Sequence, residues 1–219
     1  MKISTETVNI LKNFAAINQN LQFQPGNVIK TRTRSSEVFA AATVSETFPK
    51  AFAIYELGRF LSILGLFSDP DLEFGDASVK ISDGRNSVTY VYADPSLINA
   101  AQYDKEIKLP PVVASFDLKQ DDIARLQKAA SVLGNPTVSI VAKGGRLEVT
   151  AHDKKNPSCD KYSLDIGTTD ADDFSVDLSL DTLKFIPGDY SVEVTERIVC
   201  KFTNKNTALE YMVAGIVTR

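Results

Sequence analysis

Histidine is nearly absent from this chain of 219 residues, which contains one, and tryptophan is absent altogether. The single histidine, His152, leaves no second imidazole that could serve as the base of a serine or cysteine triad. Phosphate loops of the Walker and dinucleotide types are also missing, because Lys143-Gly144-Gly145-Arg146 has the composition of a hairpin turn. We therefore expect no catalytic residues and no bound cofactor, and we interpret His152 as a surface or packed side chain.

Cysteine is scarce, and long hydrophobic runs are missing. The two cysteines, Cys159 and Cys200, stand in a chain whose first six residues form no apolar leader. We therefore expect reduced, partly buried thiols rather than a disulfide. No apolar run approaches the roughly 20 residues that cross a bilayer. These absences favour a cytosolic protein with no membrane partner.

A strong positive charge is missing too. The formal net charge is −4 at pH 7, whereas nucleic-acid-binding domains are often strongly basic. The charge is uneven, however, because residues 2–17 and 119–133 each sum to +1, which leaves −6 for the rest. The acids of both segments, Glu6 in one and Asp121 and Asp122 in the other, would lie in the first turn of a helix, where they complement its dipole. A solvated helix face is the alternative to a binding surface here.

What the chain does contain is an internal repeat. Residues 3–17 and 118–132 match at an offset of 115 positions, which sets Val8 over Ile123 and Leu11 over Leu126. A second echo sets residues 56–60 over residues 179–183. A period of about half the chain is too long for a solenoid and predicts two domains of like architecture.

Hydrophobic periodicity gives a coarse map of the elements. We expect helices at residues 5–17, with Ser4 as N-cap and with Val8, Leu11, Phe14 and Ala15 buried, and at residues 55–67, 119–133 and, shorter, 180–185. Two hairpins are expected, across Asp83-Gly84-Arg85-Asn86 and across Lys143-Gly144-Gly145. Further strand-like runs cover residues 28–44, 51–54, 161–166, 174–178, 190–195, 198–203 and 209–217.

This order of elements predicts an α+β fold of two similar domains with antiparallel sheets and two helices each. We place the first domain at residues 1–93, an interdomain linker at residues 94–111, where the periodicity fades, and the second domain at residues 112–219.

One acidic cluster, formed by Asp170, Asp172 and Asp173, has side chains of the kind that hold a divalent metal. It lacks flanking residues with ligand geometry, so we interpret it as a solvated loop and predict no metal site. A metal-dependent hydrolase built on this cluster is one alternative function. A protein-interaction scaffold of duplicated domains, without catalysis and without DNA, is the other.

Several short segments resemble one known family when they are taken in order. They are Met1-Lys2-Ile3-Ser4, Leu11-Lys12-Asn13-Phe14-Ala15, Ala53-Ile54-Tyr55, Ala93-Asp94-Pro95-Ser96 and Pro187-Gly188-Asp189-Tyr190. Together they resemble the DNA polymerase sliding clamps, or processivity factors, of large lytic tailed phages. The resemblance spans nearly the whole chain. It implies a homotrimeric ring with sheets outside and helices lining the hole, which encircles duplex DNA and tethers the polymerase.

The resemblance also implies sites and partners. The residues expected to face DNA are basic and lie on the predicted helices or at their starts: Lys12, Arg59, Lys119, Arg125, Lys128 and Lys184. A partner groove would use apolar residues of the linker and of the last strand, although Met212 and Ile216 suit plain sheet core as well: Leu97, Ile98, Met212, Ala214 and Ile216. Subunits would join through two strands, which carry Val88, Tyr90, Tyr92, Tyr162, Leu164 and Ile166.

The implied partners are double-stranded DNA without sequence preference, a DNA polymerase, an ATP-driven clamp loader and factors of late transcription. The implied location is the cytoplasm of the infected host cell.

Overall fold

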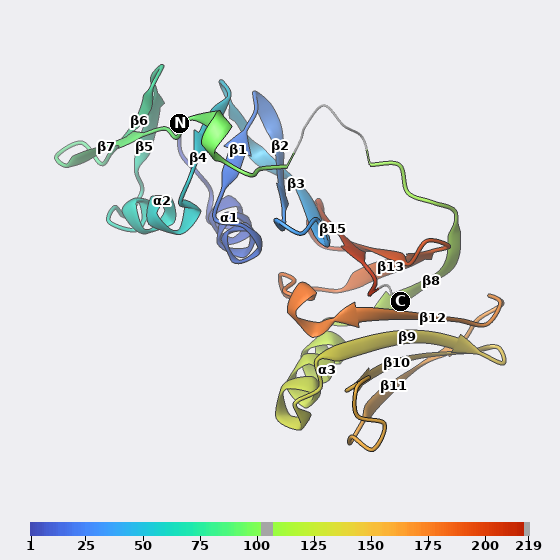
Figure 1. The fold of residues 1–219 in the computed structure, drawn as a ribbon. Coiled ribbons are helices and arrows are strands. Elements are labelled where there is room, and N and C mark those ends of the chain that lie inside the picture. The colour runs from blue at the N-terminus through green and yellow to red at the C-terminus, as the bar shows by residue number, and fades with distance from the viewer. Residues whose placement is uncertain (102–106, 217–219) are drawn as a thin grey trace. The chain divides into compact units, whose positions relative to one another are not determined.

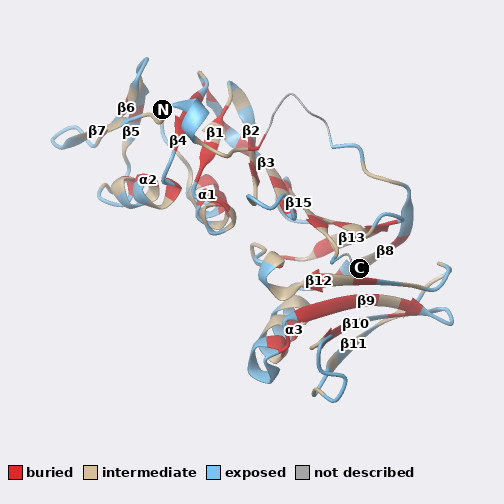
Figure 2. Cartoon of the chain, viewed as in Figure 1, coloured by how far each residue is buried: buried red, intermediate tan, exposed pale blue. Residues whose placement is uncertain are grey.

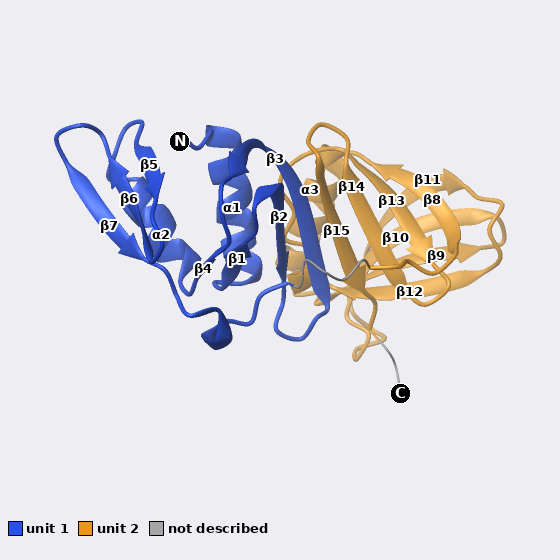
Figure 3. Cartoon of the chain, turned by 90° about the horizontal axis from the view of Figure 1, so that it is seen from above, with its two compact units in different colours: residues 1–106 blue, residues 107–219 orange. Residues whose placement is uncertain are grey.

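The computed structural model describes residues 1–101 and 107–216. The chain divides into two compact units, Met1–Glu106 and Ile107–Arg219, which Figure 3 colours separately. The division falls inside the stretch of residues 94–111 that the sequence predicts as a linker. Residues 102–106 of that stretch, and Val217 of the predicted last strand, lie outside the described residues.

The first unit combines two helices with short antiparallel strands (Figure 1). Strand β1 pairs with β4, β2 pairs with β3, and β5, β6 and β7 form a three-stranded sheet. Its elements are α1 (Thr5–Ile17), β1 (Leu21–Phe23), β2 (Gly26–Arg32), β3 (Val38–Phe48), β4 (Phe52–Ile54), α2 (Leu57–Leu64), β5 (Asp71–Phe74), β6 (Ser78–Ser82), β7 (Ser87–Val91) and the 3-10 helix η1 (Pro95–Leu97).

In its described part, residues 107–216, the second unit has one α-helix and two antiparallel sheets (Figure 1). One sheet has the order β11-β10-β9-β12 and carries α3 packed against β10 and β11, while β8, β13, β14 and β15 pair in the other. Its elements are β8 (Val112–Leu118), α3 (Gln120–Leu133), β9 (Thr137–Lys143), β10 (Arg146–His152), β11 (Tyr162–Thr168), β12 (Phe174–Ser179), the 3-10 helix η2 (Leu180–Thr182), β13 (Tyr190–Thr195), β14 (Val199–Asn204) and β15 (Leu209–Ala214).

The predicted α+β class with antiparallel sheets is confirmed, but two helices differ from the prediction. Helix α2 covers Leu57–Leu64 rather than residues 55–67. The helix expected at residues 180–185 is only a three-residue 3-10 turn. Packing explains the second difference, because the Phe185 ring lies 4.6 Å from the ring of Tyr211 and 4.7 Å from that of Phe202. These contacts draw the chain out of helical geometry, so the second unit has one α-helix where the sequence predicts two.

Equivalent hydrogen bonds show the repeat in three dimensions. In the first unit the backbone N–H of Leu57, at the start of α2, donates to the carbonyl of Gln19 at 2.8 Å. In the second, the N–H of Leu180, at the start of η2, donates to the carbonyl of Pro136 at 2.9 Å. Both acceptors follow the first helix of their unit by two or three residues. The second echo in the sequence therefore marks equivalent places even though one helix is shortened.

A buried asparagine beside each acceptor repeats as well. The side-chain amide of Asn18 donates to the carbonyls of Arg32 and Asn99, at 2.9 and 2.7 Å. That of Asn135 donates to the carbonyls of Ala151 and Asp160, at 3.1 and 3.0 Å. Buried polar groups are stabilising only when they are hydrogen-bonded, so each asparagine fixes the chain around the end of its helix. The internal repeat of the sequence, at an offset of 115 positions, does not align these two asparagines.

The interior of each unit is made by alternate residues of its strands. Figure 2 shows β9 buried along most of its length, where Val138, Ile140 and Ala142 face the interior. In α1 the buried face contains Ile10, Leu11 and Phe14. Val8 and Ala15, which the sequence predicts to be buried, are half-buried, because this face is rotated from the predicted one. None of the described helices is long and apolar enough to span a bilayer.

The N-terminus of α1 is held in two ways. The hydroxyl of Ser4 accepts a hydrogen bond from the N–H of Thr7 at 3.2 Å, which confirms the predicted cap. The carboxylate of Glu46, on β3, accepts from the N–H of Ser4 and, at 2.5 Å, from the hydroxyl of Thr7. Burial alone would raise the pKa of Glu46, but these hydrogen bonds outweigh it and lower the pKa below its usual value.

We expect Glu46→Gln to lower the free energy of unfolding at neutral pH by about 1–3 kcal/mol, the range for a hydrogen bond to a charged group. Because the pKa is lowered on folding, this stabilisation is present above the unfolded pKa and disappears as the pH falls through the folded one. Thermal melts between pH 7 and pH 3 should therefore converge at the acid end. The exposed Glu37→Gln is the control. Curves that stay equally far apart at every pH would contradict the assignment.

Candidate nucleic-acid interface and docking surfaces

Four of the predicted DNA-facing residues project from helices into solvent. Lys12 lies on α1, Arg59 on α2, and Arg125 and Lys128 on α3, and all four are exposed. None forms an ion pair with another residue in the part of the chain that the structure describes. Arg125 and Lys128 are three positions apart and therefore share one face of α3. Their positive charge is available to an anionic ligand.

Lys12 lies beside a groove in the first unit. The groove has a volume of about 340 Å³ and runs between α1 and the end of α2, with Val8, Leu61 and Leu64 among its lining residues. The two helices pack against each other, as Figure 1 shows. A basic side chain is thus displayed where the two helices meet.

Lys119 differs from these four because it is already paired. Its ammonium lies 3.1 Å from the carboxylate of Asp189, which also accepts from the N–H of Gln120 at 2.9 Å. The hydrogen bond to Asp189 raises the pKa of Lys119. Asp189 therefore caps α3 and offsets the charge of Lys119, so the positive charge of this helix comes mainly from Arg125 and Lys128. The sequence could not reveal a pair that is 70 residues apart.

Lys184 is exposed but does not lie on a helix, contrary to the prediction, because η2 ends at Thr182. The preceding residue is nevertheless tied to α3, since the side-chain amide of Gln127 donates to the carbonyl of Leu183 at 2.6 Å. This hydrogen bond holds the backbone before Lys184 beside the helix that carries Arg125 and Lys128. The predicted role of Lys184 stays a prediction.

The two strands predicted to join subunits are both edge strands. Among the described residues, β7 pairs only with β6, and β11 pairs only with β10. The predicted interface residues alternate along them, with Tyr92 directly after the end of β7, and are half-buried in the single chain: Val88, Tyr90, Tyr92, Tyr162, Leu164 and Ile166. An open edge presents unpaired backbone groups that a further strand can satisfy.

Each edge strand lies next to a helix. The ring of Tyr90 on β7 meets the ring of Phe60 on α2 edge-on, with centroids 5.2 Å apart. Burial raises the pKa of Tyr90, while the positive charge of Arg59 acts in the opposite sense. Helix α3 packs against β11. The two edges therefore differ in their residues, but each consists of an open strand beside a helix.

Two apolar side chains near the ends of these helices are unusually exposed. Leu66, which follows α2, is 72% exposed, and Val132, in the last turn of α3, is 76% exposed. Sequence reasoning missed both. The sequence carries little signal for them, since Leu66 lies beyond the end of α2, Val132 is one apolar residue off the buried stripe of α3, and a single exposed apolar residue is common.

The predicted partner groove draws on both units. Leu97, at the end of η1, is 71% exposed, and Ile98 is half-buried. On β15 the alternate residues Met212 and Ala214 are half-buried, and Ile216 beyond the strand is exposed. These residues are accessible in their own units, which argues against plain core for Met212 and Ile216. Whether they form one groove stays a prediction.

The start of the linker stretch is held to the first unit. The guanidinium of Arg32 donates to the carbonyl of Ala100 at 3.1 Å and to the side chain of Asn99 at 3.0 Å. The N–H of Asn99 donates to the side chain of Asn20 at 3.1 Å. The backbone directly after Leu97 and Ile98 is therefore held in place by hydrogen bonds, which restricts the positions of these two residues.

The acidic cluster has no metal geometry. No group of three or more histidine, cysteine, aspartate or glutamate side chains suited to a metal ion occurs in residues 1–101 and 107–216. Asp173 instead accepts from the N–H of Gly144 at 2.8 Å, which fixes the turn between β9 and β10. Asp170 and Asp172 are exposed and line a hollow in the second unit.

His152 is not isolated, but its neighbours do not form a triad. The hydroxyl of Ser139 lies 2.7 Å from Nε2 of His152 and donates to Asp177 at 2.5 Å. In a triad the imidazole stands between nucleophile and acid, whereas here the hydroxyl stands in the middle. Burial alone would raise the pKa of Asp177, but hydrogen bonds from Lys154 and Ser139 lower it, so Asp177 is a poor base. This cluster is a structural network on the face of the sheet.

Both cysteines are free, as the sequence predicts. Burial raises the pKa of the Cys200 thiol to about 12, so it is an inert core residue.

Comparison with solved structures defines the class of the fold. The structure of PCNA from A. fulgidus, with the C-terminal region of FEN-1 bound, matches with a TM-score of 0.73 at 12% identity and covers 97% of this chain and 95% of its own. At that identity the likeness concerns the fold, which is that of a sliding clamp.

Comparison of sequences identifies the family. Residues 4–101 match the model described as DNA polymerase processivity factor, and residues 115–216 match the C-terminal domain of the gp45 sliding clamp. The sliding clamp of Vibrio phage KVP40 is 30% identical over 221 residues, 98% of either chain. That of Enterobacteria phage T4 is 33% identical over 199 residues, 88% of this chain and 86% of the relative. The chain belongs to the phage sliding-clamp family and is a processivity factor of DNA replication.

Proposed function

We propose that three copies of this chain close head to tail into a ring around duplex DNA, and that the ring tethers the replicative DNA polymerase. The observation that carries the proposal is the pair of unlike open edges, β7 in the first unit and β11 in the second. A contact between two different surfaces is heterologous, and it closes into a ring when its rotation divides the circle. Three chains of two like units give a ring of six units.

Light scattering tests the proposed assembly. Three chains of 23.9 kDa give about 72 kDa (3 × 23.9). A mass of one chain at micromolar concentration that does not rise with concentration would contradict the trimer.

The interface would have two layers. In the sheet layer, β7 of one subunit pairs with β11 of the next, which satisfies the backbone groups of both edges. In the helix layer, α2 meets α3 of the next subunit, so that Leu66 and Val132 lose the exposure that they have in the single chain. Exposed apolar side chains stabilise an association when the partner subunit covers them and removes their surface from water.

DNA binding would be electrostatic and independent of sequence. The residues proposed to meet phosphates are Lys12, Arg59, Arg125, Lys128 and Lys184, with a smaller contribution from Lys119 because Asp189 already pairs with it. Phosphate contacts position a protein on DNA without reading its sequence. Because the ring itself prevents dissociation, weak attraction suffices and permits sliding.

We propose that partners dock on the apolar residues of the linker stretch and the last strand. The A. fulgidus clamp holds the C-terminal region of another protein, which supports peptide docking as a mode for this fold. An aromatic side chain of a polymerase tail would bury apolar surface at about 25 cal/mol per Å². After the cost of ordering the tail, that yields reversible affinity.

Substituting Ile98→Glu and Met212→Glu should abolish stimulation of the polymerase, because a buried carboxylate opposes an apolar tail. Trimer mass and retention on circular DNA should not change, since neither residue lies on an edge strand of the proposed interface. The measurement is primer extension on a long template, with and without the clamp. If both variants still stimulate normally, the docking groove lies elsewhere.

The remaining proposals concern how the ring is opened, what else binds to it and where it acts. We propose that the chain performs no catalysis and that an ATP-driven loader opens it, since the sequence has no nucleotide loop. ATP hydrolysis that persists through rigorous repurification would contradict this. Factors of late transcription would share the docking groove, and the location would be the cytoplasm of the infected host, as the phage relatives suggest.

A further inference from the structure

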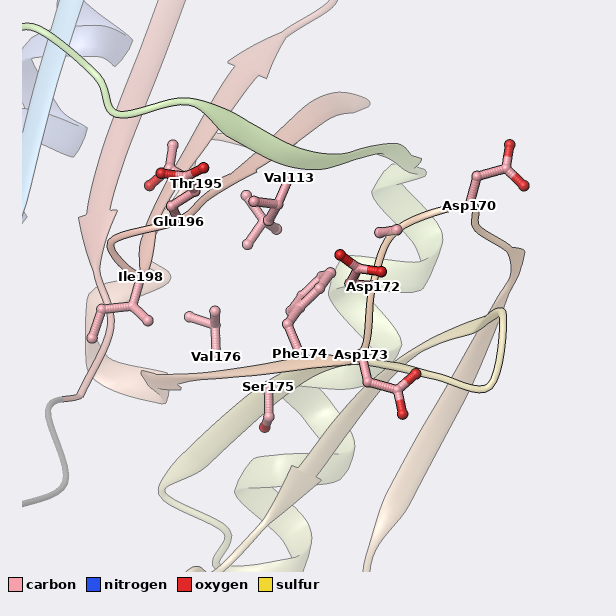
Figure 4. Close-up of a pocket in the computed structure, with 12 residues that line it drawn as sticks. Val113, Asp170, Asp172, Asp173, Phe174, Ser175, Val176, Thr195, Glu196 and Ile198 are labelled. Atoms are coloured by element: carbon pink, nitrogen blue, oxygen red, sulfur yellow. The ribbon is translucent and has the colours of Figure 1, made fainter.

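The second unit contains a hollow of about 510 Å³ that the DNA-binding and docking residues discussed above do not use. It opens where the start of β8, the start of β12 and the turn between β13 and β14 come together (Figure 4). Its volume lies within the range of small-ligand and peptide side-chain pockets.

The walls of this hollow are apolar. Figure 4 shows Val113, Phe174, Val176 and Ile198 around it, each from a different part of the unit except the pair on β12. Val113 is partly exposed and Phe174 is half-buried, so an incoming side chain would reach them. An apolar side chain placed here would therefore lose contact with water on several sides.

The backbone fixes one wall firmly. Ile198 has a φ of 54°, a left-handed value that is rare for a β-branched residue. Its N–H donates to the carbonyl of Thr195 at 3.1 Å, and its carbonyl accepts from the N–H of Gly215 at 2.7 Å. A Cβ at Gly215 would lie 2.9 Å from the carbonyl oxygen of Ile198 and 3.0 Å from a methyl group of Val176, so a larger residue would have to displace the backbone of this turn. The strained turn holds the Ile198 side chain in the wall of the hollow.

The rim is acidic. Asp170 and Asp172 come from the loop before β12, and Glu196 comes from the turn after β13. Among the described residues, no lysine or arginine lines the hollow. None of these three carboxylates has a hydrogen-bonded or ionic side-chain partner in the part of the chain that the structure describes. Figure 4 shows Asp172 beside the Phe174 ring and Asp170 farther out. Unpaired carboxylates around an apolar hollow complement a cationic ligand with an apolar part.

We propose that this hollow is a second docking site, which binds a peptide segment of a partner protein carrying a large apolar side chain flanked by lysine or arginine. The proposal rests on the proposed clamp function only in taking the partner to be another protein of replication. Its lining residues differ from those of the predicted groove of Leu97 and Met212. A clamp with two docking sites would hold two partners on one subunit at once.

The test uses the purified full-length chain and three synthetic peptides in a fluorescence anisotropy titration. The first has a central Leu-Phe pair flanked by two lysines on each side, the second has glutamates in place of the lysines, and the third keeps the lysines around a Gly-Ser centre. We expect binding of the first to exceed that of either control by about tenfold or more, since both the apolar and the charged contact are needed. Equal binding of the first and third peptides would show charge attraction alone and overturn the proposal.

Two variants locate the binding. The triple change Asp170→Asn, Asp172→Asn and Glu196→Gln should weaken the first peptide by about tenfold or more, and the effect should shrink at high salt. The change Ile198→Asn removes the apolar wall but suits the left-handed backbone, so it should keep or raise the melting temperature while binding is lost. The control is Glu37→Gln, Asp71→Asn and Glu73→Gln in the first unit, which removes the same charge elsewhere.

Unchanged binding in both variants would overturn the proposal. Because the titration contains no DNA, loader or polymerase, its failure leaves the ring and its loading untouched. Conversely, a chain that fails to form a trimer can still bind the peptide.

Discussion

Substituting Lys12, Arg125 and Lys128 with glutamate is expected to abolish productive use of the clamp on DNA without unfolding it. All three side chains are exposed on helices and form no ion pair among the described residues, so their substitution breaks no ion pair within the chain. The slope of log affinity against log salt concentration is negative, and each lost phosphate contact reduces its magnitude by about 0.9. We expect processive synthesis at moderate salt to fall by about tenfold or more.

The matched control reverses three exposed residues away from the helices, Arg34 and Lys155 in turns and Lys143 at the end of β9, and so changes the net charge by the same amount. Primer extension and the salt dependence of DNA retention are measured for both variants. Equal loss in the two would show that only the overall charge matters. No loss in the helix variant would mean that these helices do not face DNA.

The second large effect is expected from Leu66→Asp together with Val132→Asp. Leu66 is 72% exposed and Val132 76% exposed in the single chain, so the substitutions should leave its melting temperature nearly unchanged. In the ring they would place a carboxylate in each helix layer. Burial of a leucine or valine contributes about 1.5–3 kcal/mol, and 1.4 kcal/mol is a factor of ten. The association constant of each interface should therefore fall by about 100-fold or more.

Sedimentation measures this loss of assembly. The expected result is a single-chain mass for the double variant at a concentration where the parent chain is a trimer. The control Val91→Asp is informative because Val91 is as exposed as Leu66 but lies on β7 itself, and it should weaken the sheet layer in the same way. A trimer of normal stability in the Leu66 and Val132 variant would show that α2 and α3 do not meet between subunits.

Local signals explain which parts of the fold could be predicted. Helix α1 was placed at its observed bounds, because Ser4 is a strong N-cap and Leu11 and Phe14 recur at helical spacing. The hairpins at Asp83-Gly84 and Gly144-Gly145 were predicted because glycine takes the left-handed backbone that each turn requires. These features depend on residues that are close in sequence.

The features that were missed depend on distant residues. One is the packing of Phe185 against Tyr211, which ends η2 early. Another is the pairing of Asp189 with Lys119, which are 70 residues apart in the sequence. Strand β8 is not among the predicted strands, although Ala114, Phe116 and Leu118 alternate with polar residues, because it directly follows Pro110-Pro111 at the end of the predicted linker. It is stabilised as a strand by pairing with β13. For the site, the sequence suggested the basic helix residues, but Leu66 and Val132 emerge only once exposure is known.

The most direct test of the account is topological. The clamp is loaded by its loader onto nicked circular DNA, and its retention is followed after a restriction enzyme cuts the circle. The account predicts that the clamp stays on the circle at a salt concentration that weakens phosphate contacts, and that it leaves within the time needed to slide off once the DNA is linear. A clamp that dissociates from circular and linear DNA at the same rate would contradict encirclement.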